Sequence, residues 1–130
     1  MTTHPASCRC GQLSATATGT PVRVSVCHCL DCQKRSGSAF AAQVRFPAEQ
    51  VKIAGDHKHY AHSGANGVTR FHFCPDCGSH LSFRHDNAPD SIAIPLGAFR
   101  DPKAFTPAFS MFESRKHDWV EISGETIEHD

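Results

Sequence analysis

The chain lacks net charge, because its 13 Lys and Arg residues balance its 13 Asp and Glu residues over 130 positions. General nucleic-acid binders carry a clear excess of basic residues, and proteins that lie on membrane surfaces carry a basic amphipathic stretch. Neither pattern is present. We therefore expect neither a nucleic acid nor a membrane as a partner.

Long hydrophobic runs are also missing. No apolar segment approaches the roughly 18 residues that a membrane-spanning helix needs. The first residues, Met-Thr-Thr-His-Pro, are neither basic nor apolar and predict no secretory signal. We expect a cytoplasmic protein, and the length predicts that residues 1–130 form one domain.

No segment has a sustained helical period. Instead, short runs alternate apolar and polar side chains and are separated by Gly and Pro residues, which predicts a mostly β domain of antiparallel sheets. The alternating runs cover residues 13–17, 22–26, 40–44, 51–53, 69–73, 81–83, 92–94 and 119–122. Residues 31–37 and 101–105 are expected to form short helical turns, the second with Asp101 as N-cap before Pro102.

Cysteine is frequent for a chain of this length, with seven residues. Seven cysteines are an odd number, and without a secretory signal they favour reduced thiolates that bind metal over a disulfide framework. They fall into three tight groups along the chain. These are Cys8-x-Cys10, Cys27-x-Cys29-x-x-Cys32 and Cys74-x-x-Cys77.

The two outer pairs add up to four ligands, which is the number of a closed structural zinc site. We predict one zinc held by Cys8, Cys10, Cys74 and Cys77, with Pro75 and Gly78 shaping a tight knuckle. Such a zinc would join the N-terminus to the middle of the chain and add directly to folding energy. The alternative is that Cys8 and Cys10 are free surface thiols.

The middle group supplies three ligands, which is the number of a catalytic zinc with an open fourth position. We predict a second zinc at Cys27, Cys29 and Cys32, and we assign these three residues as catalytic. Three thiolates weaken the ion as a Lewis acid, so the open position suits a soft substrate thiolate better than hydroxide. Two alternatives stay open: a closed site completed by His28 or by a distant histidine, and an iron–sulfur cluster.

Three stretches together resemble the glutathione-dependent formaldehyde-activating enzyme family, to which some centromere-protein-V-type domains are related. They are Cys8-Arg-Cys-Gly, the stretch from Cys27 to Phe40 with Cys-His-Cys-x-x-Cys, and Phe73-Cys-Pro-Asp-Cys-Gly78. A weaker C-terminal similarity covers Phe112 to Ser114 and Trp119-Val120. One departure stands out: Ser110 occupies the place where the family often has a histidine.

The resemblance implies sheets in a β-tent arrangement stapled by zinc, with one structural and one catalytic zinc per chain. It also implies a carbon–sulfur lyase that adds a thiol such as glutathione to a small aldehyde such as formaldehyde, or catalyses the reverse. Glutathione carries two carboxylates, and Lys34 and Arg35 directly follow the metal loop, so we assign them to thiol binding. The alternative function is a non-enzymatic zinc-binding interaction module or a redox module.

Overall fold

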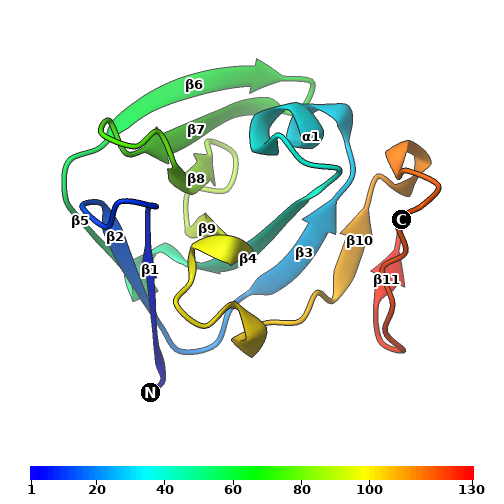
Figure 1. The fold of residues 1–130 in the computed structure, drawn as a ribbon, viewed down its shortest axis with the longest axis horizontal. Coiled ribbons are helices and arrows are strands. Elements are labelled where there is room, and N and C mark those ends of the chain that lie inside the picture. Colours follow the sequence, from blue (N-terminus) through cyan, green and yellow to red (C-terminus); the bar gives the residue numbers. More distant parts are fainter.

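Most of the alternating segments become strands of two β-sheets in a computed structural model that describes residues 1–130 (Figure 1). The smaller sheet is antiparallel and has the order β1-β2-β5. Its strands are β1 (Thr3–Ser7), β2 (Ser14–Thr18) and β5 (Val51–Ala54). Alternation explains β2: Ala15 and Ala17 are buried, whereas Thr16 between them is exposed.

The larger sheet has eight strands in the order β11-β10-β3-β4-β9-β8-β7-β6. In chain order they are β3 (Arg23–Cys27), β4 (Ala41–Pro47), β6 (Lys58–Gly64), β7 (Gly67–Phe73), β8 (His80–His85), β9 (Ser91–Pro95), β10 (Phe109–Met111) and β11 (Glu128–His129). Every neighbouring pair is antiparallel except that β10 runs parallel to both β3 and β11. The prediction of a mostly β protein with antiparallel sheets is confirmed, with β10 as the parallel exception.

Four strands were not predicted, and one predicted strand is wrong. All residues of β6 are exposed, so the strand leaves no alternating pattern. The predicted strand at residues 119–122 is irregular chain instead, and the side chain of Trp119 is 76% exposed. This aromatic and β-branched run has the composition of a strand, but it pairs with no neighbouring strand.

The single α-helix is α1 (Leu30–Ser36), as the sequence predicted. It begins after Cys29, whose sulfur accepts a hydrogen bond from the backbone N–H of Cys32, and it ends at Gly37. Gly37 adopts the left-handed conformation (φ +68°) that glycine favours at helix ends. The structure contains no helix that could span a membrane.

Four single-turn 3-10 helices complete the structure. They are η1 (Ala48–Gln50), η2 (Leu96–Ala98), η3 (Pro102–Ala104) and η4 (Glu113–Arg115). The turn expected at 101–105 is therefore present, with Pro102 in its first position, although the Asp101 side chain makes no capping hydrogen bond.

The hydrophobic core lies where the two sheets meet. Its largest fully buried side chain is Phe46, whose ring contacts those of Phe99 and Phe105 at centroid distances of 6.2 Å each. Burying a side chain of this size stabilises the fold by about 1.5–3 kcal/mol. Two cysteines, Cys8 and Cys74, belong to this same core cluster. One cysteine group is therefore continuous with the core.

Candidate active site

The four outer cysteines converge as predicted. All four sulfurs lie within 4.8 Å of one another, and Cys10 Sγ is 3.6 Å from Cys8 Sγ and 3.7 Å from Cys74 Sγ. A tetrahedral zinc with bonds of about 2.3 Å separates its sulfurs by about 3.8 Å. The donor set and its spacing therefore fit a closed tetrahedral metal site.

Two loops bring these four sulfurs together. Cys8 and Cys10 lie between β1 and β2. The first alternating run of the sequence, residues 13–17, is thus the second strand, because the unpredicted β1 precedes these cysteines. Cys74 and Cys77 follow β7 in the predicted knuckle, where Gly78 adopts φ +78° and donates its N–H to the Cys74 carbonyl at 2.8 Å. This turn points both sulfurs to the same side.

Hydrogen-bond donors face these sulfurs. The backbone N–H of Leu13 donates to Cys8 Sγ at 3.3 Å, and the Gln12 amide donates to Cys74 Sγ at 3.1 Å. The Cys77 thiol donates to the Ser79 hydroxyl at 3.4 Å, and hydrogen bonding with the side chain and then the backbone of Ser79 lowers the pKa of Cys77 to about 5. Donors of this kind stabilise thiolates, which are the protonation state that a metal binds.

The three middle cysteines also converge, with all three sulfurs within 4.8 Å of one another. Cys27 is the last residue of β3, Cys29 caps α1, and Cys32 lies in the first turn of that helix. The strand end and the helix start thus present three sulfurs from six consecutive residues. The spacing fits one metal ion, and no histidine nitrogen or carboxylate joins the group.

Negative charge in this group concentrates on Cys32. Hydrogen bonding by the Cys27 thiol lowers the pKa of Cys32 to about 6, with further help from Cys29 and Arg35 and against the effect of burial. The hydrogen bond between Cys27 and Cys32, together with burial, raises the pKa of Cys27. Burial is also the main cause that raises the pKa of Cys29. The group by itself therefore carries one thiolate, at Cys32, and a metal ion that binds all three sulfurs would displace the protons of Cys27 and Cys29.

His28 does not complete the site. Its side chain is fully buried and turned into the protein, where Nε2 is 2.9 Å from the Ser110 hydroxyl and the ring lies 5.7 Å from that of Phe40. Burial lowers the pKa of His28, so the ring is neutral near pH 7. Ser110 is therefore the hydrogen-bond partner of His28 and does not line the cavity described next.

A cavity of about 500 Å³ opens beside the three-cysteine group, and all three of these cysteines line it. Its other wall residues come from β3, β4, α1, the β6–β7 hairpin, β8 and the segment after β10. Those used below are Arg23, Ser25, Asp31, Arg35, Gln43, Arg45, His62, Phe71, Phe83, His85 and Phe112. The wall contains three arginines but one carboxylate, that of Asp31, which lies 3.3 Å from His62 Nε2. The cavity is therefore cationic.

Arg35 is fixed next to the sulfurs. Its guanidinium stacks near the rings of Phe71 and Phe83, at 5.2 and 4.9 Å from their centroids, and Nη2 lies 3.7 Å from Cys32 Sγ. Such cation–π contacts hold a guanidinium in one place. The sequence singled out Arg35 together with Lys34, but Lys34 is exposed and does not line the cavity.

Phe112 lies at the mouth of the cavity in a strained backbone conformation. It is the single non-glycine residue with positive φ (57°), and its side chain is 45% exposed. Left-handed backbone is uncommon for a bulky residue and concentrates at functional sites. The strain turns the chain after β10 so that Met111 and Phe112 border the cavity.

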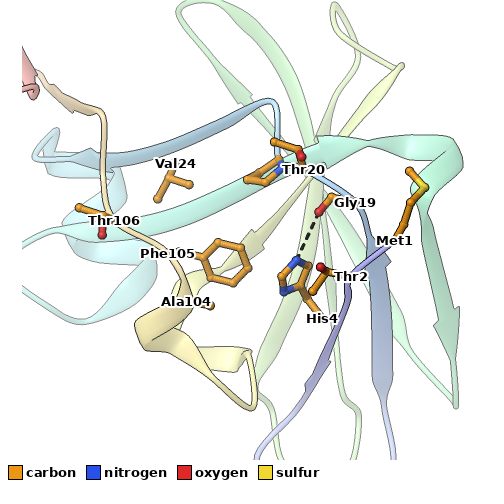
Figure 2. Close-up of a pocket in the computed structure, with 10 residues that line it drawn as sticks. Met1, Thr2, His4, Gly19, Thr20, Val24, Ala104, Phe105 and Thr106 are labelled. Carbon is orange, nitrogen blue, oxygen red and sulfur yellow. Dashed lines mark hydrogen bonds between the residues drawn. The ribbon is translucent and has the colours of Figure 1, made fainter.

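A second hollow of about 500 Å³ lies away from the cysteines (Figure 2). Its wall includes Met1, His4 and Phe105, and His4 Nε2 is 3.3 Å from the Gly19 carbonyl oxygen, the contact dashed in the figure. It contains no cysteine, carboxylate or arginine. Size does not identify the site, because two further hollows of about 550 and 660 Å³ are also present, the larger one beside Cys8. The three converging sulfurs in its wall identify the cavity at Cys27, Cys29 and Cys32 as the candidate site.

Comparison with known proteins agrees with this site. The model of the family described as glutathione-dependent formaldehyde-activating enzyme matches residues 3–115, which include all seven cysteines. The chain belongs to this family. A crystal structure of a Rhodobacter sphaeroides protein matches with a TM-score of 0.61 at 12% identity, covering 82% of this chain and 98% of that one, and so supports the fold. No curated protein sequence matches the chain.

Proposed function

We propose that this member of the glutathione-dependent formaldehyde-activating family is a zinc-dependent carbon–sulfur lyase-type enzyme. It would join a thiol such as glutathione to a small aldehyde such as formaldehyde, or catalyse the reverse cleavage. Cys8, Cys10, Cys74 and Cys77 would hold a structural zinc, and Cys27, Cys29 and Cys32 a catalytic zinc. The family match supports the reaction class.

The observation that carries the proposal is the incomplete ligand set at the cavity. Three sulfurs converge, the neighbouring His28 is turned away to Ser110, and the sulfurs line a cavity of about 500 Å³. A closed structural site needs a fourth protein ligand, whereas a site that binds substrate leaves this position open. The four-cysteine group, in the same chain, shows the closed arrangement.

When bound there, zinc would keep a substrate sulfur deprotonated at neutral pH. Arg35 offsets the negative charge of three thiolates, which would otherwise repel an anionic thiol. Addition of the thiol to an aldehyde forms one carbon–sulfur bond, and the proton of the thiol ends on the former carbonyl oxygen. The imidazoles of His62 and His85 belong to the cavity wall and are the groups proposed to hold and return that proton.

The proposal is tested first by metal content and by the absorption spectrum of a cobalt-substituted sample. We expect two metal ions per chain and a spectral change on addition of glutathione. The rate of S-hydroxymethylglutathione formation from ¹³C-formaldehyde, measured by exchange NMR, should exceed the uncatalysed rate. Two metal ions with neither a spectral response to thiols nor a rate increase would contradict the enzyme proposal and favour a binding module.

A further inference from the structure

One face of two neighbouring strands carries a row of polar side chains that ends at the three-cysteine group. On β3, Arg23, Ser25 and Cys27 are spaced two residues apart and therefore point to the same side. On β4, Gln43 pairs with Ser25 and Arg45 pairs with Arg23 across the strands. All five residues line the cavity. The row leads from a pair of arginines to the proposed metal position.

The two arginines have no acidic partner. The ion pairs of the structure join His62 to Asp31, Arg70 to Asp86 and His129 to Glu113, and neither Arg23 nor Arg45 donates a hydrogen bond from its side chain. Burial and the charge of Arg23 lower the pKa of Arg45. Like charges directly opposite each other destabilise a sheet, so the fold alone does not account for this pair.

Aromatic rings hold the arginines in the wall. The Arg23 guanidinium lies 4.0 Å from the centroid of the Phe109 ring, and that of Arg45 lies 5.9 Å from the centroid of Phe83. These contacts orient the guanidinium groups without neutralising them. Paired guanidinium groups with free N–H donors in a partly buried cavity are suited to a carboxylate, which they can bind in a bidentate manner.

Gln43 adds a second recognition element beside the arginines. Its side chain is buried; Nε2 donates to the Ser25 hydroxyl at 3.1 Å, whereas Oε1 has no hydrogen-bond partner. A buried acceptor without a partner is unfavourable, so a ligand that supplies an N–H there gains affinity. The complete recognition surface thus matches a carboxylate with an N–H group close to it, as at the end of a peptide.

We propose that Arg23 and Arg45 bind a terminal carboxylate of the thiol substrate, while Gln43 Oε1 accepts a hydrogen bond from the N–H next to it. This proposal rests on the proposed function and deepens it by naming the residues that select the thiol. Arg35, which contacts Cys32 Sγ, serves the sulfur end of the same cavity.

The distance between the arginines and Cys27 makes the cavity selective for the length of the thiol substrate. Arg23 and Cys27 are four residues apart on one strand, which corresponds to about 13 Å between their Cα atoms. In free cysteine the carboxylate and the sulfur belong to one residue, so a cysteine bound through its sulfur does not reach the arginines. In glutathione each carboxylate is separated from the sulfur by a peptide or isopeptide unit. The site therefore favours an extended acidic thiol over a short one.

The test uses S-methylglutathione, whose blocked sulfur removes any need for a thiolate on the metal. Isothermal titration calorimetry of the metal-loaded protein should show binding, and Arg23→Met or Arg45→Met should each weaken it about 10-fold or more. Arg100→Met is the matched control, because Arg100 is exposed and outside this cavity, and its binding should equal wild type. The thermal midpoints of Arg23→Met and Arg45→Met should equal or exceed that of the wild-type protein, because repulsion between the two arginines is removed.

A second measurement compares glutathione with cysteine on the cobalt-substituted protein. Both arginine variants should lose affinity for glutathione and keep their affinity for cysteine. Equal losses for both thiols, or S-methylglutathione binding as tight in the variants as in Arg100→Met, would overturn the carboxylate proposal. A cobalt spectrum that responds to no thiol would instead defeat the proposed function, while binding of S-methylglutathione would still test the arginine pair by itself. If Arg45→Met does not fold, Arg23→Met alone supports or overturns the proposal, because both arginines are proposed to bind the same carboxylate.

Discussion

The two cysteine groups of this protein use the same ligand chemistry in opposite structural settings. The four-cysteine group joins residues 64 positions apart, Cys10 and Cys74, and two of its members, Cys8 and Cys74, are part of the hydrophobic core. The three-cysteine group comes from six consecutive residues and lines a cavity. The first arrangement connects distant parts of the fold, and the second leaves room for a ligand.

This difference predicts that the two metals contribute unequally to the free energy of unfolding. A metal that joins distant segments restricts the unfolded chain and contributes its binding free energy to folding. A metal bound within one loop constrains little beyond that loop. We therefore expect the four-cysteine group to determine stability and the three-cysteine group to determine activity. The predictions below test this division, in order of decreasing effect.

The largest effect is expected for Cys74→Ser. Cys74 is fully buried, and structural zinc contributes about 10–16 kcal/mol in small zinc peptides, comparable to the whole stability of a domain. The variant should lose its cooperative thermal transition, as followed by circular dichroism. A transition within a few degrees of wild type would show that this group does not support the fold.

Cys32→Ser makes the same chemical change in the other group and serves as the matched control. We expect a folded protein with one metal ion per chain and no enzyme activity, because one of three ligands is lost while the core is untouched. Metal analysis, circular dichroism and the formaldehyde assay together check this. Unfolding as complete as in Cys74→Ser would remove the distinction between the two groups.

Graded chelation tests the same division without a mutation. Three protein ligands should hold a metal less tightly than four, so a mild chelator should remove one ion first and leave the circular dichroism spectrum unchanged. Activity should disappear in this first step. Removal of both ions in a single step, together with unfolding, would contradict the prediction.

Both metal groups could be predicted from the sequence because their signals are local. A spacing such as Cys-x-x-Cys places two sulfurs on one short turn, from which both can reach the same ion. The turn at Gly78 and the helix after Cys29 were predictable for the same reason. The pairing of Cys8-x-Cys10 with Cys74-x-x-Cys77 followed from the ligand count of a closed zinc site.

The cationic wall of the cavity could not be predicted in this way. Lys34 and Arg35 are neighbours in sequence, but successive helical positions point in directions about 100° apart, and only Arg35 faces the cavity. Arg23 and Arg45 alternate with apolar residues and so looked like the solvated face of ordinary strands. Their meeting depends on the pairing of β3 with β4, which no local pattern encodes. Proximity in sequence was a poor guide to proximity in the cavity.

The smallest predicted effect concerns His80, the first residue of β8. It follows Cys77 by three residues, its Nε2 is 3.3 Å from the Tyr60 hydroxyl, and burial, together with the charge of Arg35, lowers its pKa below the usual 6.5. The unfolded chain then takes up a proton at His80 before the folded protein does. The stability from neutral His80 is therefore complete above pH 6.5 and is lost as the pH falls from 6.5 through the folded pKa.

The His80→Gln variant should accordingly lose less thermal stability than wild type between pH 7.5 and 5.5, with metal in excess. The difference in midpoint should be a few degrees at most, because the group is only half-buried and is linked to neither sulfur cluster by a hydrogen bond. His59→Gln, at an exposed position on β6, controls for the loss of an imidazole. Identical pH dependence in wild type and His80→Gln would assign the acid sensitivity to other groups, namely the cysteine sulfurs and the histidines His28 and His72, whose pKa values burial also lowers. The difference between the two metal groups would then be best measured by following the release of each metal during acid titration.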